Sequence, residues 1–182
     1  MSGFRHVGDR EVARLHRIRV VSAEFEAPDG STFERDVVRD IGWVGIVALL
    51  DDGRSVLLVR QYRGPIDADL LEIPAGVRDV PGEDPEVTAG RELAEEVGRR
   101  AAQLTRLARV HNSAGFTDEE GLIYLATGLE IVDTDLQGPE EQHMTVHVVD
   151  LADVPAMVSG GRLTDAKTII GLLAAREHLG LR

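Results

Sequence analysis

The sequence has no cysteine, few aromatic residues and no long apolar run. The lack of cysteine in 182 residues excludes disulfide bonds, thiolate metal sites and cysteine nucleophiles. Aromatic residues make up only 4%, so we expect a core of Val, Leu, Ile and Ala. The longest apolar stretch, Val44 to Leu50, is far too short to cross a bilayer, and charged residues interrupt the N-terminus. These absences predict a cytoplasmic protein without membrane association.

Positive charge is also scarce, because the formal net charge is −12. A general nucleic-acid binder needs a basic surface, so we expect no nucleic-acid partner. An anionic substrate would need cations at its site, supplied either by a few arginines or by metal. The surplus of carboxylates favours metal.

Hydrophobic residues make up 43% and charged residues 29%, an ordinary globular balance. A first strand pair is predicted over residues 15–25 and 32–38, around the turn sequence APDGS. Further strands are expected over 44–50, 55–62, 70–76, 103–111, 122–127 and 144–149, with helices over 84–98, 154–158 and 165–179. For the last helix Thr164 is the expected N-cap. The order lacks regular β-α-β alternation, which favours an α+β fold or a mixed sheet between helices.

Three glutamates share one face of the predicted helix over 84–98. Glu92, Glu95 and Glu96 stand at positions i, i+3 and i+4, so their like charges repel unless a cation compensates them. A divalent metal with oxygen ligands is the best fit. Glutamate runs are also common on solvated helix faces, and the helix alone does not exclude that interpretation.

The loop before this helix favours the metal site. Residues 73–84 contain two prolines and two glycines and can fold back over the helix N-terminus. A helix N-terminus and exposed loop amides favour phosphate. Carboxylates beside such a loop indicate phosphoanhydride chemistry.

The same segment resembles the Nudix box, G-x5-E-x7-R-E-U-x-E-E-x-G-U, where U is aliphatic. The matching residues are Gly76, Glu83, Arg91, Glu92, Leu93, Glu95, Glu96 and Gly98. Two positions depart from the pattern: six residues instead of five separate Gly76 from Glu83, and Arg99 holds the last aliphatic position.

This resemblance to the Nudix hydrolase family implies an α+β fold, an α/β/α sandwich with a mixed sheet between helices. It implies that Glu92 and Glu96 bind Mg²⁺ or Mn²⁺, and that Glu95 is a further ligand or holds a metal-bound water. The backbone carbonyl of Ala75 is the other implied ligand. Glu83 and Arg91 are expected to tie the loop to the helix.

Sequence outside the box is similar to the ADP-ribose pyrophosphatase subgroup, over residues 57–65, 70–76, 114–129 and 140–154. The similarity implies that Arg63 contacts substrate and that Glu72 lies near the nucleotide. It also implies a catalytic loop glutamate, either Glu140 or Glu141, with Glu141 slightly preferred. An acidic turn before a strand is the alternative for that pair.

The N-terminal β hairpin, residues 1–40, is expected to pack or swap against a second subunit in a homodimer, apart from a hydrolase domain over 41–182. Arg35 and Arg39 of this hairpin are candidates for substrate contact; the alternative is a pair of surface charges. Ala114 stands where the subgroup usually has proline, which weakens the substrate assignment.

The predicted function is metal-dependent hydrolysis of a nucleoside diphosphate derivative, first of all ADP-ribose to AMP and ribose 5-phosphate. Two alternatives remain open: a pyrophosphatase for another sugar nucleotide or a damaged nucleotide, and a non-catalytic Nudix module that senses a ligand. The intact glutamate set argues against the second of these.

Overall fold

The computed structural model describes residues 3–136 and 141–181. They form two compact units, one comprising the chain up to Gly42 with His111–Glu120, the other comprising Trp43–Val110 and the chain from Gly121. No helix in these two described ranges is long and apolar enough to cross a membrane.

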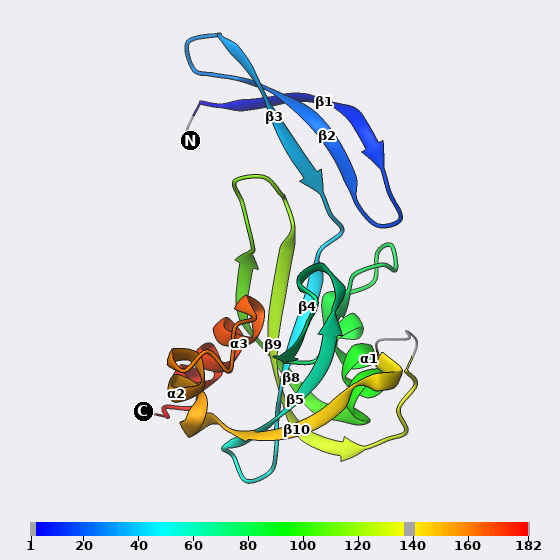
Figure 1. The fold of residues 1–182 in the computed structure, drawn as a ribbon, viewed down its shortest axis with the longest axis vertical. Coiled ribbons are helices and arrows are strands. Elements are labelled where there is room, and N and C mark those ends of the chain that lie inside the picture. The colour runs from blue at the N-terminus through cyan, green and yellow to red at the C-terminus, as the bar shows by residue number, and fades with distance from the viewer. Residues whose placement is uncertain (1–2, 137–140, 182) are drawn as a thin grey trace. The chain divides into compact units, whose positions relative to one another are not determined.

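The first unit is built on a three-stranded antiparallel sheet in the order β1-β2-β3 (Figure 1). Its strands are β1 (Arg5–Arg14), β2 (Arg19–Glu26) and β3 (Thr32–Arg39). The predicted hairpin is the β2–β3 pair, and Gly30 adopts a positive φ of 84° in its turn. Strand β1 was missed, because almost all its residues are exposed and it lacks the apolar alternation that marks a half-buried strand.

A segment far along the chain completes this unit. The Val38 N–H donates to the Phe116 carbonyl at 2.8 Å, and the Asp118 carboxylate accepts from the Asp40 N–H at 3.0 Å. The domain boundary expected at residue 40 assigned residues 111–120 to the hydrolase domain. Their place in the first unit was not predicted, because pairing between distant residues leaves no local signal in the sequence.

The second unit holds a seven-stranded mixed sheet with the path β10-β5-β4-β9-β8, where β6 pairs with β5 and β7 with β4. The β4–β9 pair is parallel. The strands are β4 (Trp43–Leu49), β5 (Ser55–Arg63), β6 (Ala68–Glu72), β7 (Ala75–Val77), β8 (Arg99–His111), β9 (Glu120–Ile131) and β10 (Thr145–Asp150). The helices are α1 (Pro85–Val97), α2 (Val154–Ser159) and α3 (Ala166–His178), with short 3₁₀ turns η1 (Gly64–Ile66), η2 (Glu141–His143) and η3 (Leu151–Asp153).

Strand alternation divides the core of this unit into two layers. In β4, Val47 and Leu49 pack into the cluster that holds residues of α2 and α3, whereas Ile46 and Ala48 pack into the cluster that holds residues of α1. Successive strand side chains point to opposite faces, so each face is covered by its own helices (Figure 1). The sandwich expected from the sequence is thereby confirmed, and Trp43 is a buried core residue.

Local capping fixes the helix ends. Helix α1 begins after Asp84, whose side chain accepts from the Glu86 N–H at 2.9 Å, and ends at Gly98 with φ 60°, as predicted. Helix α3 begins one residue later than predicted. Its N-cap is Asp165, which accepts from the Thr168 N–H at 2.9 Å, so the expectation of Thr164 was wrong.

Candidate active site

The site is built where β7 lies beside β4 and α1 packs against both. The Glu96 carboxylate accepts a hydrogen bond from the Ala75 N–H at 3.0 Å, which joins the helix to the strand. Gly76 lies against the Glu92 carboxylate. A Cβ at position 76 would stand 2.0 Å from the carboxyl carbon of Glu92. The glycine therefore makes room for a carboxylate.

Arg91 is the centre of an ion-pair network in the loop and helix. Its Nη1 donates to Glu92 at 2.8 Å and to Glu95 at 3.3 Å. Its Nη2 stands 3.4 Å from Asp79 and 3.6 Å from Glu83. These contacts tie the loop to the helix and orient two of the three helix glutamates.

Glu92 and Glu96 of the helix face have raised pKa values. Burial raises the pKa of Glu92 to about 7, which Arg91 partly opposes. Burial raises the pKa of Glu96 to about 8, which the hydrogen bond from Ala75 partly opposes. The two carboxylates repel each other, and Glu141 repels both. A cation bound here would remove this cost.

The donor chemistry fits Mg²⁺, which takes oxygen ligands from a few carboxylates and carbonyls. Glu92 and Glu96 are four residues apart on one helix face and lack enough cationic compensation to keep ordinary pKa values. Within residues 3–136 and 141–181, no three His, Cys, Asp or Glu side chains form a ready metal cluster. In this geometry Glu95 is paired with Arg91, and its role as a ligand stays a prediction.

The loop glutamate falls in a short 3₁₀ turn. Glu141 begins η2, and its charge acts on both Glu92 and Glu96, which places it at the same site. Glu140 lies outside the described residues.

Arg63 and Glu72 form a bidentate ion pair at the ends of β5 and β6. The Arg63 Nε and Nη2 donate to the two Glu72 oxygens, each at 2.7 Å. Glu72 is fully buried, whereas the Arg63 side chain is 41% exposed. Of these two predicted substrate-binding residues, only Arg63 is accessible to a ligand, and the buried Glu72 carboxylate holds its guanidinium in place. Lys167 of α3 also donates to Glu72, a contact that the sequence analysis did not identify.

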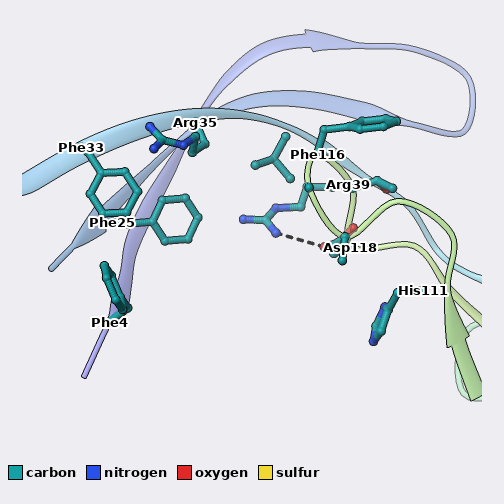
Figure 2. A pocket seen from close by; sticks show the side chains of 12 residues that line it. Phe4, Phe25, Phe33, Arg35, Arg39, His111, Phe116 and Asp118 are labelled. Carbon is teal, nitrogen blue, oxygen red and sulfur yellow. Dashed lines mark hydrogen bonds and ion pairs between the residues drawn. The ribbon is translucent and has the colours of Figure 1, made fainter. Parts of the chain in front are cut away.

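The first unit contains a cavity of about 460 Å³ (Figure 2). The rings of Phe25 and Phe33 stack with centroids 5.6 Å apart, and the Arg35 guanidinium lies 4.7 Å from the centre of the Phe33 ring. Aromatic faces beside a guanidinium suit a flat, anionic or π-rich ligand.

Arg39 lines the same cavity but is held by two carboxylates. It donates to both oxygens of Asp9, at 2.9 and 2.8 Å, and to Asp118 at 3.1 Å (Figure 2). The hydrogen bonds from Arg39 lower the pKa of Asp9 to about 2. The arginine that is more available to a ligand is thus Arg35.

Comparisons with known proteins agree with this geometry. A family model described as the NUDIX domain matches residues 42–169. The chain is 40% identical over 147 residues to an ADP-ribose pyrophosphatase of Mycobacterium tuberculosis, covering 81% of this chain and 70% of that protein. It is 36% identical over 145 residues to an ADP-ribose pyrophosphatase of Bacillus subtilis, covering 80% and 77%. A crystal structure of an ADP compounds hydrolase aligns with a TM-score of 0.82 and 25% identity, covering 97% of this chain and 94% of that one.

Proposed function

The chain belongs to the NUDIX hydrolase family, and from that premise we propose that it is a Mg²⁺-dependent ADP-ribose pyrophosphatase. Water adds to one phosphorus of ADP-ribose, the bond from that phosphorus to the bridging oxygen breaks, and the products are AMP and ribose 5-phosphate. The similarity to two ADP-ribose pyrophosphatases favours this substrate over other sugar nucleotides, damaged nucleotides and a purely sensing role.

The single observation that carries the proposal is the pair of poorly compensated carboxylates at Ala75 and Gly76, of which Glu96 is buried and Glu92 is partly buried. Glu96 is only 7% exposed, yet no side-chain cation among the described residues bonds to it directly, and burial raises its pKa to about 8. Such a site has a built-in deficit of positive charge. A divalent cation satisfies that deficit, and its remaining positive charge can bind the anionic diphosphate of the substrate.

We propose Mg²⁺ as the resident ion, with Mn²⁺ as a substitute. Glu92, Glu96 and the Ala75 carbonyl would hold it, with Glu95 as a further ligand or a holder of bound water. When bound, the ion would lower the pKa of a water molecule and would stabilise the negative charge on the leaving phosphate. We propose that Glu141 accepts a proton from the attacking water, which is supported by the effect of its charge on both Glu92 and Glu96.

Substrate recognition is proposed for Arg63 in the second unit and for Arg35 and Arg39 in the first. Arg63 offers an exposed guanidinium edge to the diphosphate, and Glu72 fixes its orientation. Arg35 stands over an aromatic ring at the cavity, an arrangement that can take a nucleobase or a phosphate.

The direct test is product analysis. Purified protein with Mg²⁺ and ADP-ribose should release AMP and ribose 5-phosphate in equal amounts, and chelation should stop the reaction. GDP-mannose and other sugar nucleotides, assayed in competition, should be hydrolysed with a lower kcat/KM. Absence of AMP release from neutral to alkaline pH would contradict the proposed substrate.

We also propose a homodimer in which the N-terminal unit contributes to the interface, as the subgroup resemblance implies. Light scattering on the purified chain tests this, and a monomer across micromolar concentrations would contradict it. A cytoplasmic location stays a prediction.

A further inference from the structure

Glu72 stands between two cations. It is fully buried at the end of β6, and its two oxygens accept from the Arg63 Nε and Nη2, both at 2.7 Å. The Lys167 Nζ donates to the same Oε2 that accepts from Arg63. A buried carboxylate requires such partners, because the removal of its charge from water is costly unless it is paired.

Lys167 is unusual in this chain. Of the 20 Lys and Arg residues it is the only lysine, and its side chain is only 14% exposed. Its Nζ also lies 3.0 Å from Asp165. A compact ammonium with three donors can bond both Glu72 and Asp165 where the Arg63 guanidinium already occupies one side of Glu72. A second planar guanidinium would fit poorly there.

The backbone around Lys167 is anchored to the strand that carries Glu72. Asp165 caps α3 by accepting from the Thr168 N–H at 2.9 Å and from its hydroxyl at 2.6 Å. The Thr168 hydroxyl in turn accepts from the Ile73 N–H at 2.9 Å. The helix start is therefore fixed against residues 72–73, and the lysine is aimed at the carboxylate.

Arg63, at the far end of this series of contacts, lies within electrostatic range of the candidate active site. The bidentate pair with Glu72 uses the Arg63 Nε and Nη2, which leaves the Nη1 edge for other partners. The hydrogen bonds to Glu72 raise the pKa of Arg63 most, and the charge of Glu96 adds to the rise. Arg63 is thus in electrostatic range of the proposed metal ligands.

We propose that Lys167 is a positioning residue for substrate binding: it holds the Glu72 carboxylate, which fixes the Arg63 guanidinium that contacts the diphosphate. This inference rests on the proposed function of the same site. Arg63 acts on the ligand, and Lys167 acts only through Glu72.

The first test replaces Lys167 with Met, which keeps the length of the side chain and removes the charge. We expect the Kd for ADP, measured by calorimetry with Mg²⁺ present, to rise about tenfold. The KM for ADP-ribose should rise by a similar factor, with kcat within about twofold, because ground-state binding is lost. The matched control is Arg54→Met, which removes an exposed ion pair with Asp150 and should change neither constant.

A double-mutant cycle separates positioning from simple loss of packing. Arg63→Met alone should weaken ADP binding at least as much as Lys167→Met. In the Arg63→Met background the lysine substitution should add less than about twofold, because the residue it positions is gone. Equal, independent losses in the two backgrounds would overturn the inference.

The chain's composition permits a chemical rescue. Because it has no cysteine, Lys167→Cys carries a single thiol, and bromoethylamine converts that thiol to a thioether analogue of lysine. Alkylation in denaturant followed by refolding should return ADP affinity to within about threefold of wild-type protein taken through the same cycle. Alkylation with iodoethane, which adds a neutral group, should not restore it.

The outcomes distinguish this inference from the proposed function. If Lys167→Met lowers Tm but leaves the Kd for ADP and the KM unchanged, the lysine is structural and the inference is wrong. If wild-type protein binds ADP in a Lys167-dependent way but does not hydrolyse ADP-ribose, the inference stands and the proposed substrate fails. Failure of wild-type protein to bind ADP overturns the inference.

Discussion

Two buried glutamates of the second unit, Glu72 and Glu96, behave in opposite ways. Their exposed fractions are 0% and 7%, so both pay a large desolvation cost. For Glu72 burial would raise the pKa, but Arg63 and Lys167 together lower it below its usual value. For Glu96 burial prevails and raises the pKa to about 8.

The difference shows what each carboxylate is built to do. Glu72 already has its counter-charges within the protein, so it serves as a fixed anchor for an arginine. Glu96 accepts from one backbone N–H, and within residues 3–136 and 141–181 no side-chain cation is bonded to it. A carboxylate buried without a partner is costly unless a ligand compensates it, which is the expected state of a metal-binding residue before the metal arrives.

The strongest test of the comparison is Glu96→Gln. Removing a metal ligand should lower kcat for ADP-ribose by about 10³-fold, equivalent to about 4 kcal/mol of transition-state stabilisation. The metal-free protein should stay folded, because Gln can still accept from the Ala75 N–H and carries no buried charge. Glu130→Gln, at an exposed position of β9, is the matched control and should retain full activity. Wild-type turnover by Glu96→Gln would refute the assignment.

The same substitution at the other glutamate should have a different effect. Glu72→Gln should lower the free energy of unfolding by about 3 kcal/mol, because it leaves Arg63 and Lys167 without their anion. Urea denaturation at pH 7 measures this. The pKa of Glu72 is lower in the folded than in the unfolded protein. Ionised Glu72 therefore stabilises the fold at pH values above its unfolded-state pKa, and this stabilisation is lost as the pH falls through its folded-state pKa. If Glu72→Gln and wild type had the same free energy of unfolding at pH 7, Glu72 would not be an internally paired anion that stabilises the fold, and it would no longer differ from Glu96 in this way.

Metal removal should expose the raised pKa values of Glu92 and Glu96. In chelator, their neutral forms stabilise the fold below the unfolded pKa near 4.5, and this contribution is lost as the pH rises through about 7 and 8. The Tm of metal-free protein should therefore fall between pH 5 and pH 9, and less steeply in Glu96→Gln. Mg²⁺ at a hundred times its Kd should restore about 2.7 kcal/mol. A metal-free Tm that rises over this range would contradict the assigned shifts.

The smallest effect is expected from Gly76→Ala. The added Cβ would stand 2.0 Å from the Glu92 carboxyl carbon and must displace it, at a cost of about 1–2 kcal/mol in stability with a loss of activity. Gly90→Ala is the control on α1: nothing lies within 4 Å of its Cβ, and alanine favours a helix by about 1 kcal/mol. In thermal denaturation, the Tm should fall for Gly76→Ala and rise for Gly90→Ala. A stabilised, fully active Gly76→Ala would show that Glu92 does not need this space.

The sequence allowed the helix that carries the glutamates to be predicted in full. Asp84 and Gly98 are local signals, and the helix begins and ends where they indicate. Strand β1 was not predicted because its residues are exposed on both faces, and the cap of α3 was misplaced by one residue because Thr164 and Asp165 are both good caps. Only the hydrogen bond to Thr168 selects Asp165.

The same division holds for the site. Glu92, Glu95 and Glu96 could be grouped from the sequence because helical spacing alone puts them on one face. Which of them has no bonded cation in the described part of the chain depended on the tertiary structure, because Arg91 pairs with Glu92 and Glu95 while Glu96 accepts from Ala75. The sequence by itself determined the family and the reaction class, and it predicted the carboxylates of the site, since these rest on the local spacing of the box residues. The tertiary structure decided how Lys167 meets Glu72 across 95 residues, because only the packing of α3 against the sheet brings the two charges together.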